Sequence, residues 1–108
     1  MSTFDNREKA FENKFAHDAE MQFKAEARRN KLLGLWAAEK MGLAGAEAEA
    51  YAKEVIMADF EEKGDEDVYR KVSGDFQNKG VAVPEAELRS QMRELLAQAK
   101  EQLLKEAG

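Results

Sequence analysis

The sequence contains no cysteine, one histidine and one proline among its 108 residues. Without cysteine, the chain can form neither a disulfide nor a thiolate metal site. A single histidine also excludes a metal site built from several histidines. One proline and seven glycines interrupt the chain at few positions, so the composition favours a few long helices over many short strands. We therefore expect an all-α protein.

Long apolar runs are missing as well. No stretch approaches the roughly 20 apolar residues that a membrane-spanning helix requires. The first five residues lack the charged and then apolar layout of a secretory signal. These two absences predict a cytoplasmic protein without direct membrane insertion.

An excess of positive charge is also lacking, because 17 basic and 22 acidic side chains give a net charge of −5. Proteins that bind nucleic acid neutralise its phosphates mainly with lysine and arginine. The charge balance therefore argues against a nucleic-acid partner. The charged fraction of 36% is high for a globular chain and is typical of solvated helices.

Glycine and proline divide the chain into helical segments. Gly42, Gly64 and Gly80 each suit the left-handed residue that follows a helix, and Pro84 suits the first turn of a new helix. The boundaries predict four helices, at about 18–41, 46–63, 66–79 and 84–106.

Two of these segments show a clear apolar stripe. Val68, Val72 and Phe76 recur every four residues, which places them on one face of a helix. The last segment carries the strongest periodic signal, with apolar residues at spacings of four, three, four and four: Leu88, Met92, Leu95, Ala99 and Leu103. Gly74 lies inside the third helix and should weaken it by about 1 kcal/mol relative to alanine.

The first helical segment is too long for the rest of the domain. A continuous helix over residues 5–41 would extend about 55 Å at roughly 1.5 Å per residue, whereas the remaining residues would form a domain only about 30 Å across. We therefore divide the chain into a projecting or flexible N-terminal arm, residues 1–17, and a four-helix bundle, residues 18–108.

Aromatic side chains mark the arm. Phe4, Phe11 and Phe15 follow one another at spacings of seven and four, so a helix would carry them as one stripe. Such rings either dock on the bundle or, in a segment that folds on binding, anchor it in the groove of a partner. The spacing alone leaves both readings open.

A dense basic run follows in the first helix of the bundle. Arg28, Arg29 and Lys31 precede Trp36, and together they are candidate contacts for a phosphate or nucleotide. The alternative is a solvated helix face, which is the usual role of a charge run. No glycine-rich phosphate loop is present, so a strong nucleotide site would be unconventional.

Catalytic residues are not evident. The carboxylates lie on Ala/Glu-rich helical segments without an activated nucleophile or a set of metal ligands to complete a catalytic site. The sequence therefore predicts a protein that is not an enzyme, contains no catalytic or metal-binding residues and requires no cofactor.

Two blocks carry a specific likeness to a known family. The run Phe4–Asp18, with its particular order of charged and aromatic residues, and the run Ala27–Glu39 closely resemble the zeta subunits of alphaproteobacterial F-type ATP synthases. The likeness continues through Gly42-Leu43 and Ala46–Lys53 into Asp59-Phe60. It is weaker in the last quarter of the chain, which matches mainly as an amphipathic helix.

The resemblance implies a regulatory four-helix bundle that inhibits ATP hydrolysis by the soluble head of the synthase. The arm of such a subunit enters an alpha/beta catalytic interface near the gamma shaft. The expected partners are the alpha, beta and gamma subunits, with the protein associated peripherally with the membrane-bound synthase. On this chain the partner-binding arm residues would be Phe4, Arg7, Glu8, Lys9, Phe11, Glu12, Asn13, Lys14 and Phe15.

Two other functions stay open at this stage. The bundle could serve as a helical adaptor for another partner, with the arm as a tether. It could also sense adenine nucleotides through its basic run and Trp36, with ADP or ATP as a weak regulatory ligand. Regulation of an ATPase is compatible with such sensing.

Overall fold

The computed structural model describes residues 19–59 and 65–107, which form four helices and no strand. The helices are α2 (Ala19–Lys40), α3 (Ala46–Ala58), α4 (Asp65–Lys79) and α5 (Glu85–Ala107). The predicted all-α bundle is confirmed for this part of the chain. No helix within it is long and apolar enough to cross a membrane.

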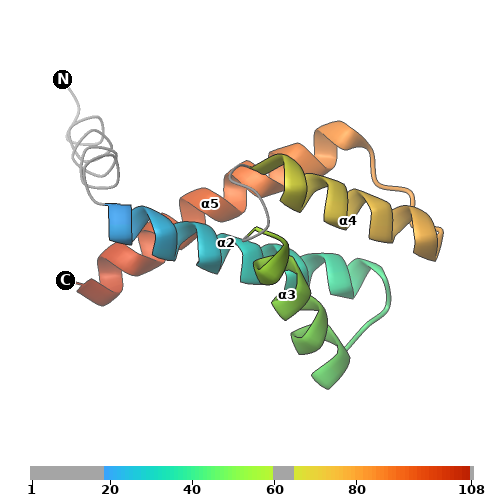
Figure 1. Ribbon diagram of the computed structural model, residues 1–108, viewed down its shortest axis with the longest axis horizontal. Coiled ribbons are helices and arrows are strands. Elements are labelled where there is room, and N and C mark those ends of the chain that lie inside the picture. The colour runs from blue at the N-terminus through green and yellow to red at the C-terminus, as the bar shows by residue number, and fades with distance from the viewer. Residues whose placement is uncertain (1–18, 60–64, 108) are drawn as a thin grey trace.

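The two long helices, α2 and α5, form the backbone of the bundle (Figure 1). The N-terminal end of α2 lies beside the C-terminal end of α5, where Arg28 bonds to Glu106. The short helices α3 and α4 pack toward the opposite end of this pair. The bundle is therefore thicker at one end, and the first turns of α2 extend beyond the region where α3 packs.

Glycines end two of the helices as the sequence predicts. Gly42 has φ of +79°, its N–H donates to Glu39 O at 3.1 Å, and the Leu43 N–H donates to Ala38 O at 2.8 Å. Gly80, with φ of +72°, repeats the pattern at the end of α4. These bonds form Schellman motifs, which satisfy carbonyl groups that a helix end otherwise leaves without donors.

The predicted stripes form the core. Val68, Val72 and Phe76 of α4 are all buried, with exposures of 2% or less. On α5, four of the five stripe residues are buried and Leu103 is half-buried. They surround Leu33, Ala37 and Ala38 of α2 together with Tyr51 and Val55 of α3.

Gly34 sets the distance between α2 and α3. A Cβ atom built on this residue would lie 2.6 Å from the Ala52 Cα and 3.1 Å from the Ala52 Cβ. Since the closest neighbour is backbone, a side chain here would force the two helices apart. No local pattern in the sequence indicates this contact, because Ala52 is 18 residues further along the chain.

Among the described residues, α3 ends at Ala58 and Asp59 lies in a turn. The predicted end at residue 63 and its stop signal, Gly64, lie outside the described residues. The Asp59 N–H bonds to Ile56 O, three residues back, which tightens the last turn as at many helix ends. The Ala/Glu-rich composition predicts a helix here, but neither a glycine nor a proline marks its end at Ala58.

Candidate functional site

Only one of the two predicted sites lies within the described residues. The partner-binding arm falls outside the described residues, so its nine assigned positions remain predictions. The basic run and Trp36 all lie on α2 and can be described in detail.

Arg28 binds the end of α5. Its guanidinium donates to both carboxylate oxygens of Glu106, with Nη2 at 3.0 Å from Oε1, and Nη1 lies 3.5 Å from Gln102 Oε1. The hydrogen bond from Arg28 holds the pKa of Glu106 below its ordinary value. Arg28 thus ties the first half of α2 to the last turns of α5.

Arg29 is buried, with an exposure of 1%. Its Nη2 donates to Asp65 Oδ1 at 2.9 Å and its Nε donates to Asn30 Oδ1 at 2.7 Å. Asp65 is the first residue of α4, and its side chain is 57% exposed. A carboxylate at the start of a helix commonly accepts from the free N–H groups of that helix. In the structure the Asp65 carboxylate accepts from α2, so the pair fastens the start of α4 to the centre of the bundle.

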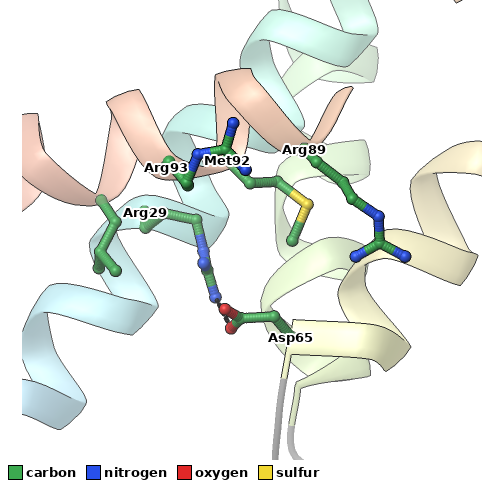
Figure 2. Close-up of a pocket in the computed structure, with 6 residues that line it drawn as sticks. Arg29, Asp65, Arg89, Met92 and Arg93 are labelled. Atoms are coloured by element: carbon green, nitrogen blue, oxygen red, sulfur yellow. Dashed lines mark hydrogen bonds and ion pairs between the residues drawn. The ribbon is translucent and has the colours of Figure 1, made fainter. Parts of the chain in front are cut away.

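A small cavity of about 140 Å³ opens beside this pair (Figure 2). Arg29 of α2 and Asp65 of α4 line it together with four residues of α5: Arg89, Met92, Arg93 and Leu96. Three arginines therefore approach one cavity, although two of them have carboxylate partners.

Arg89 is held in place by α4 and by its own helix. It donates to Glu66 at 2.9 Å and to Glu85 at 3.2 Å, and its guanidinium carbon lies 4.0 Å from the centre of the Tyr69 ring. These contacts combine charge-assisted hydrogen bonds with a cation–π interaction. Arg93, in contrast, is exposed and has no ion-pair partner among the described residues.

Trp36 is partly buried and packs against the core, two turns along α2 from Arg29. Its ring meets the Phe76 ring edge to face, with centroids 5.9 Å apart, and the Lys40 ammonium lies 5.2 Å from its centroid. Lys31 is exposed. The structure therefore does not gather the four predicted residues around one space: Arg29 lines the cavity, Arg28 binds the end of α5 and Trp36 packs on α4.

A second polar cluster joins α3 to α4. The Tyr51 hydroxyl donates to Asp75 Oδ2 at 2.8 Å, and Lys71 Nζ lies 3.0 Å from the same oxygen. Burial, followed by the hydrogen bond to Asp75, raises the pKa of Tyr51 above its ordinary value, so the phenol remains protonated. Lys71 and Asp75 are an i,i+4 pair on α4, but nothing in the sequence indicates that Tyr51 of α3 joins them.

Acidic groups gather near Arg29 as well. Burial, together with repulsion from Asp59 and Asp65, raises the pKa of Glu26 above its ordinary value, while Arg29 and Lys100 oppose the shift. Within residues 19–59 and 65–107, no group of three or more histidine or carboxylate side chains is arranged to hold a metal ion.

Comparison with known proteins identifies the family of this chain. A protein solved by solution NMR is 62% identical to the chain, with a TM-score of 0.71; the alignment covers 80% of this chain and 98% of that one. No curated protein matches the chain. The family description ATPase inhibitor subunit zeta matches residues 1–102, which include both the arm and nearly all of the bundle. The chain therefore belongs to the ATPase inhibitor subunit zeta family.

Proposed function

We propose that this protein inhibits ATP hydrolysis by an F-type ATP synthase, with its arm entering an alpha/beta catalytic interface near the gamma shaft. The family match carries the proposal, because it extends over residues 1–102 and thus includes the arm. A family of ATPase inhibitor subunits supports a regulatory role and binding to the synthase, with the protein a peripheral and not a catalytic component.

The arm is the part of the chain suited to this insertion. Its charged side chains are of both signs, and its three rings stand at helical spacings, as in segments that fold into a partner's groove. Phe4, Phe11 and Phe15 fill apolar pockets, and the charged residues between them fix the register. The bundle then holds the arm at the surface of the synthase.

Crosslinking tests where the arm lies. A photoreactive amino acid replaces Phe11 in the full chain, and a matched chain carries it at Met57, which is 64% exposed on α3. With the cognate synthase head, the probe at residue 11 should crosslink to the alpha or beta subunit far more than the probe at residue 57. Equal crosslinking from both positions would contradict insertion of the arm.

A second candidate function is weak regulation by ADP or ATP, favoured by the approach of Arg29, Arg89 and Arg93 to one cavity. Its volume of about 140 Å³ is below the 300 Å³ typical of small ligand pockets, so it has room for a phosphate group and not for a whole nucleotide. Calorimetric titration of the full chain with millimolar ADP or ATP tests the idea, because Trp36 does not line the cavity. Saturable heat of binding supports the idea, and its absence counts against it.

An adaptor role is the remaining alternative, with the arm as a tether to a different partner. Pull-down from the source cells separates it from the main proposal. Recovery of the alpha, beta and gamma subunits supports the inhibitor, whereas a different set of proteins without them supports the adaptor.

A further inference from the structure

A groove lies at the end of the bundle where α2 and α4 both finish. Its walls come from three places: Met41 and Leu43 follow α2, Tyr51 belongs to α3, and Lys79 is the last residue of α4. The two helices end on the same side of the molecule (Figure 1). The groove is separate from the cavity beside Arg29, with which it shares no lining residue.

One wall of the groove is apolar. Met41 and Leu43 are half-buried and pack against the core, and Tyr51 is buried between them and α4. Leu43 is fixed by the bond from its N–H to Ala38 O at 2.8 Å. A methionine side chain adapts to the shape of an occupant, because it is unbranched and has three rotatable bonds. This wall therefore suits an apolar side chain.

The size of the groove limits what can enter it. Its volume is about 240 Å³. A cavity of about 150 Å³ accommodates benzene, whereas pockets for whole small molecules start at about 300 Å³. The groove thus has room for one aliphatic or aromatic group that is part of a larger molecule. A side chain of another polypeptide fits this description.

The carboxylates that line the groove are already engaged. Lys71 Nζ lies 3.0 Å from Asp75 Oδ2 and 3.5 Å from Glu54 Oε1. The Tyr51 hydroxyl donates to the same Asp75 oxygen at 2.8 Å. An occupant therefore finds little free hydrogen-bond acceptor capacity on this wall.

The free groups at the rim are donors. Asn78 and Lys79 are exposed, and the side chain of neither forms an ion pair or hydrogen bond in the part of the chain that the structure describes. A carboxylate next to the inserted apolar side chain would complement the charge of Lys79 and accept from the Asn78 amide.

We propose that this groove binds an acidic segment of a partner protein. The segment inserts one apolar side chain against Met41 and Leu43 and places an adjacent carboxylate on Lys79. This inference goes beyond the inhibitory function, because it involves neither the arm nor the cavity beside Arg29. It gives the bundle an attachment point of its own.

The experiment records amide chemical shifts of the isotope-labelled full chain during titration with capped tetrapeptides. The first peptide has leucine and aspartate at its centre. Matched peptides replace the aspartate with asparagine or lysine, or the leucine with alanine. The leucine–aspartate peptide should give saturable shifts at residues 41–43 and 78–79. It should bind about threefold more tightly than the asparagine peptide, as expected for one exposed ion pair, and about tenfold more tightly than the alanine peptide.

Variants of the chain locate the contact. Lys79→Gln should remove the preference for aspartate. Lys53→Gln is the matched control, because Lys53 is an exposed lysine of α3 that does not line the groove, and it should keep the preference. Met41→Glu should abolish binding, whereas Met41→Leu should preserve it. Circular dichroism first establishes that each variant is folded.

Several results would overturn the inference. One is the absence of saturable shifts with the leucine–aspartate peptide at millimolar concentration. Equal binding of the aspartate and lysine peptides, or a preference for aspartate that survives Lys79→Gln, would show that Lys79 does not select the occupant. Shifts centred on residues away from the groove would place binding elsewhere and contradict the assignment.

Discussion

Two glycines in helical interiors should respond to the same substitution in opposite directions. A Cβ on Gly34 would lie 2.6 Å from the Ala52 Cα, whereas a Cβ on Gly74 of α4 would meet no atom within 4 Å. Alanine improves the intrinsic helix propensity at either site by about 1 kcal/mol. Gly74→Ala should therefore stabilise the bundle by about that amount.

At Gly34 the packing cost exceeds the gain in propensity. Backbone atoms cannot rotate away as a flexible side chain can, so α2 and α3 must separate, and overpacking of this kind costs about 1–3 kcal/mol or more. After the propensity gain of about 1 kcal/mol is subtracted, Gly34→Ala should thus destabilise the protein by up to about 2 kcal/mol. For a domain of this size, 1 kcal/mol shifts Tm by roughly 4–8 °C.

Thermal and urea unfolding of the two variants and the parent chain measure this difference. We expect a higher Tm for Gly74→Ala and a lower Tm for Gly34→Ala. Equal stabilisation by both substitutions would refute the close approach of α2 and α3 at Gly34, because only helix propensity would then be acting.

Three further predictions concern the arm, the Glu26 carboxyl group and the Arg29–Asp65 ion pair. Phe11→Ala should weaken inhibition more than Lys9→Ala, because burying a ring contributes about 1.5–3 kcal/mol and an exposed ion pair about 1 kcal/mol or less. Hydrolysis titrations rank the two variants, and a reversed order would contradict the assigned roles. The raised pKa of Glu26 means that the folded chain holds its proton more tightly than the unfolded chain; stability is therefore lost as the pH rises from the ordinary glutamate range through the raised folded value. Glu26→Gln should remove this loss in melts across pH, and a parallel profile would contradict the shift. Asp65→Ala should lower the free energy of unfolding by about 2–3 kcal/mol, because it leaves buried Arg29 without its carboxylate. Arg29→Met should lower it by less, because the half-exposed Asp65 carboxylate regains water. Urea unfolding measures both variants, and equal losses of stability would contradict this asymmetry.

Much of the fold follows from local signals in the sequence. Gly42 and Gly80 end their helices with the predicted backbone bonds, and the apolar spacing of α4 and α5 identifies most of the core they contribute. These predictions succeed because capping and helical periodicity depend on residues close in sequence. The end of α3 at Ala58 has no such local signal, since neither a glycine nor a proline marks it, and the predicted stop at Gly64 lies outside the described residues.

The contacts between helices could not be predicted in the same way. Nothing near Gly34 in sequence indicates that Ala52 approaches it, and nothing near Arg29 indicates that Asp65 is its partner. The basic run illustrates the difference: Arg28 binds Glu106 of α5 and Arg29 binds Asp65 of α4, whereas Lys31 is exposed. Long-range pairing of this kind depends on tertiary packing, which periodicity does not encode.

The most direct test of the inhibitory role compares the full chain with a version that begins at Asp18. Both are titrated into ATP hydrolysis by the cognate synthase head, after circular dichroism has established that the shorter version retains the folded bundle. Inhibition by the full chain together with its loss in the shorter version is the predicted result. Equal inhibition by both would move the inhibitory surface into the bundle, and no inhibition by either would contradict the account.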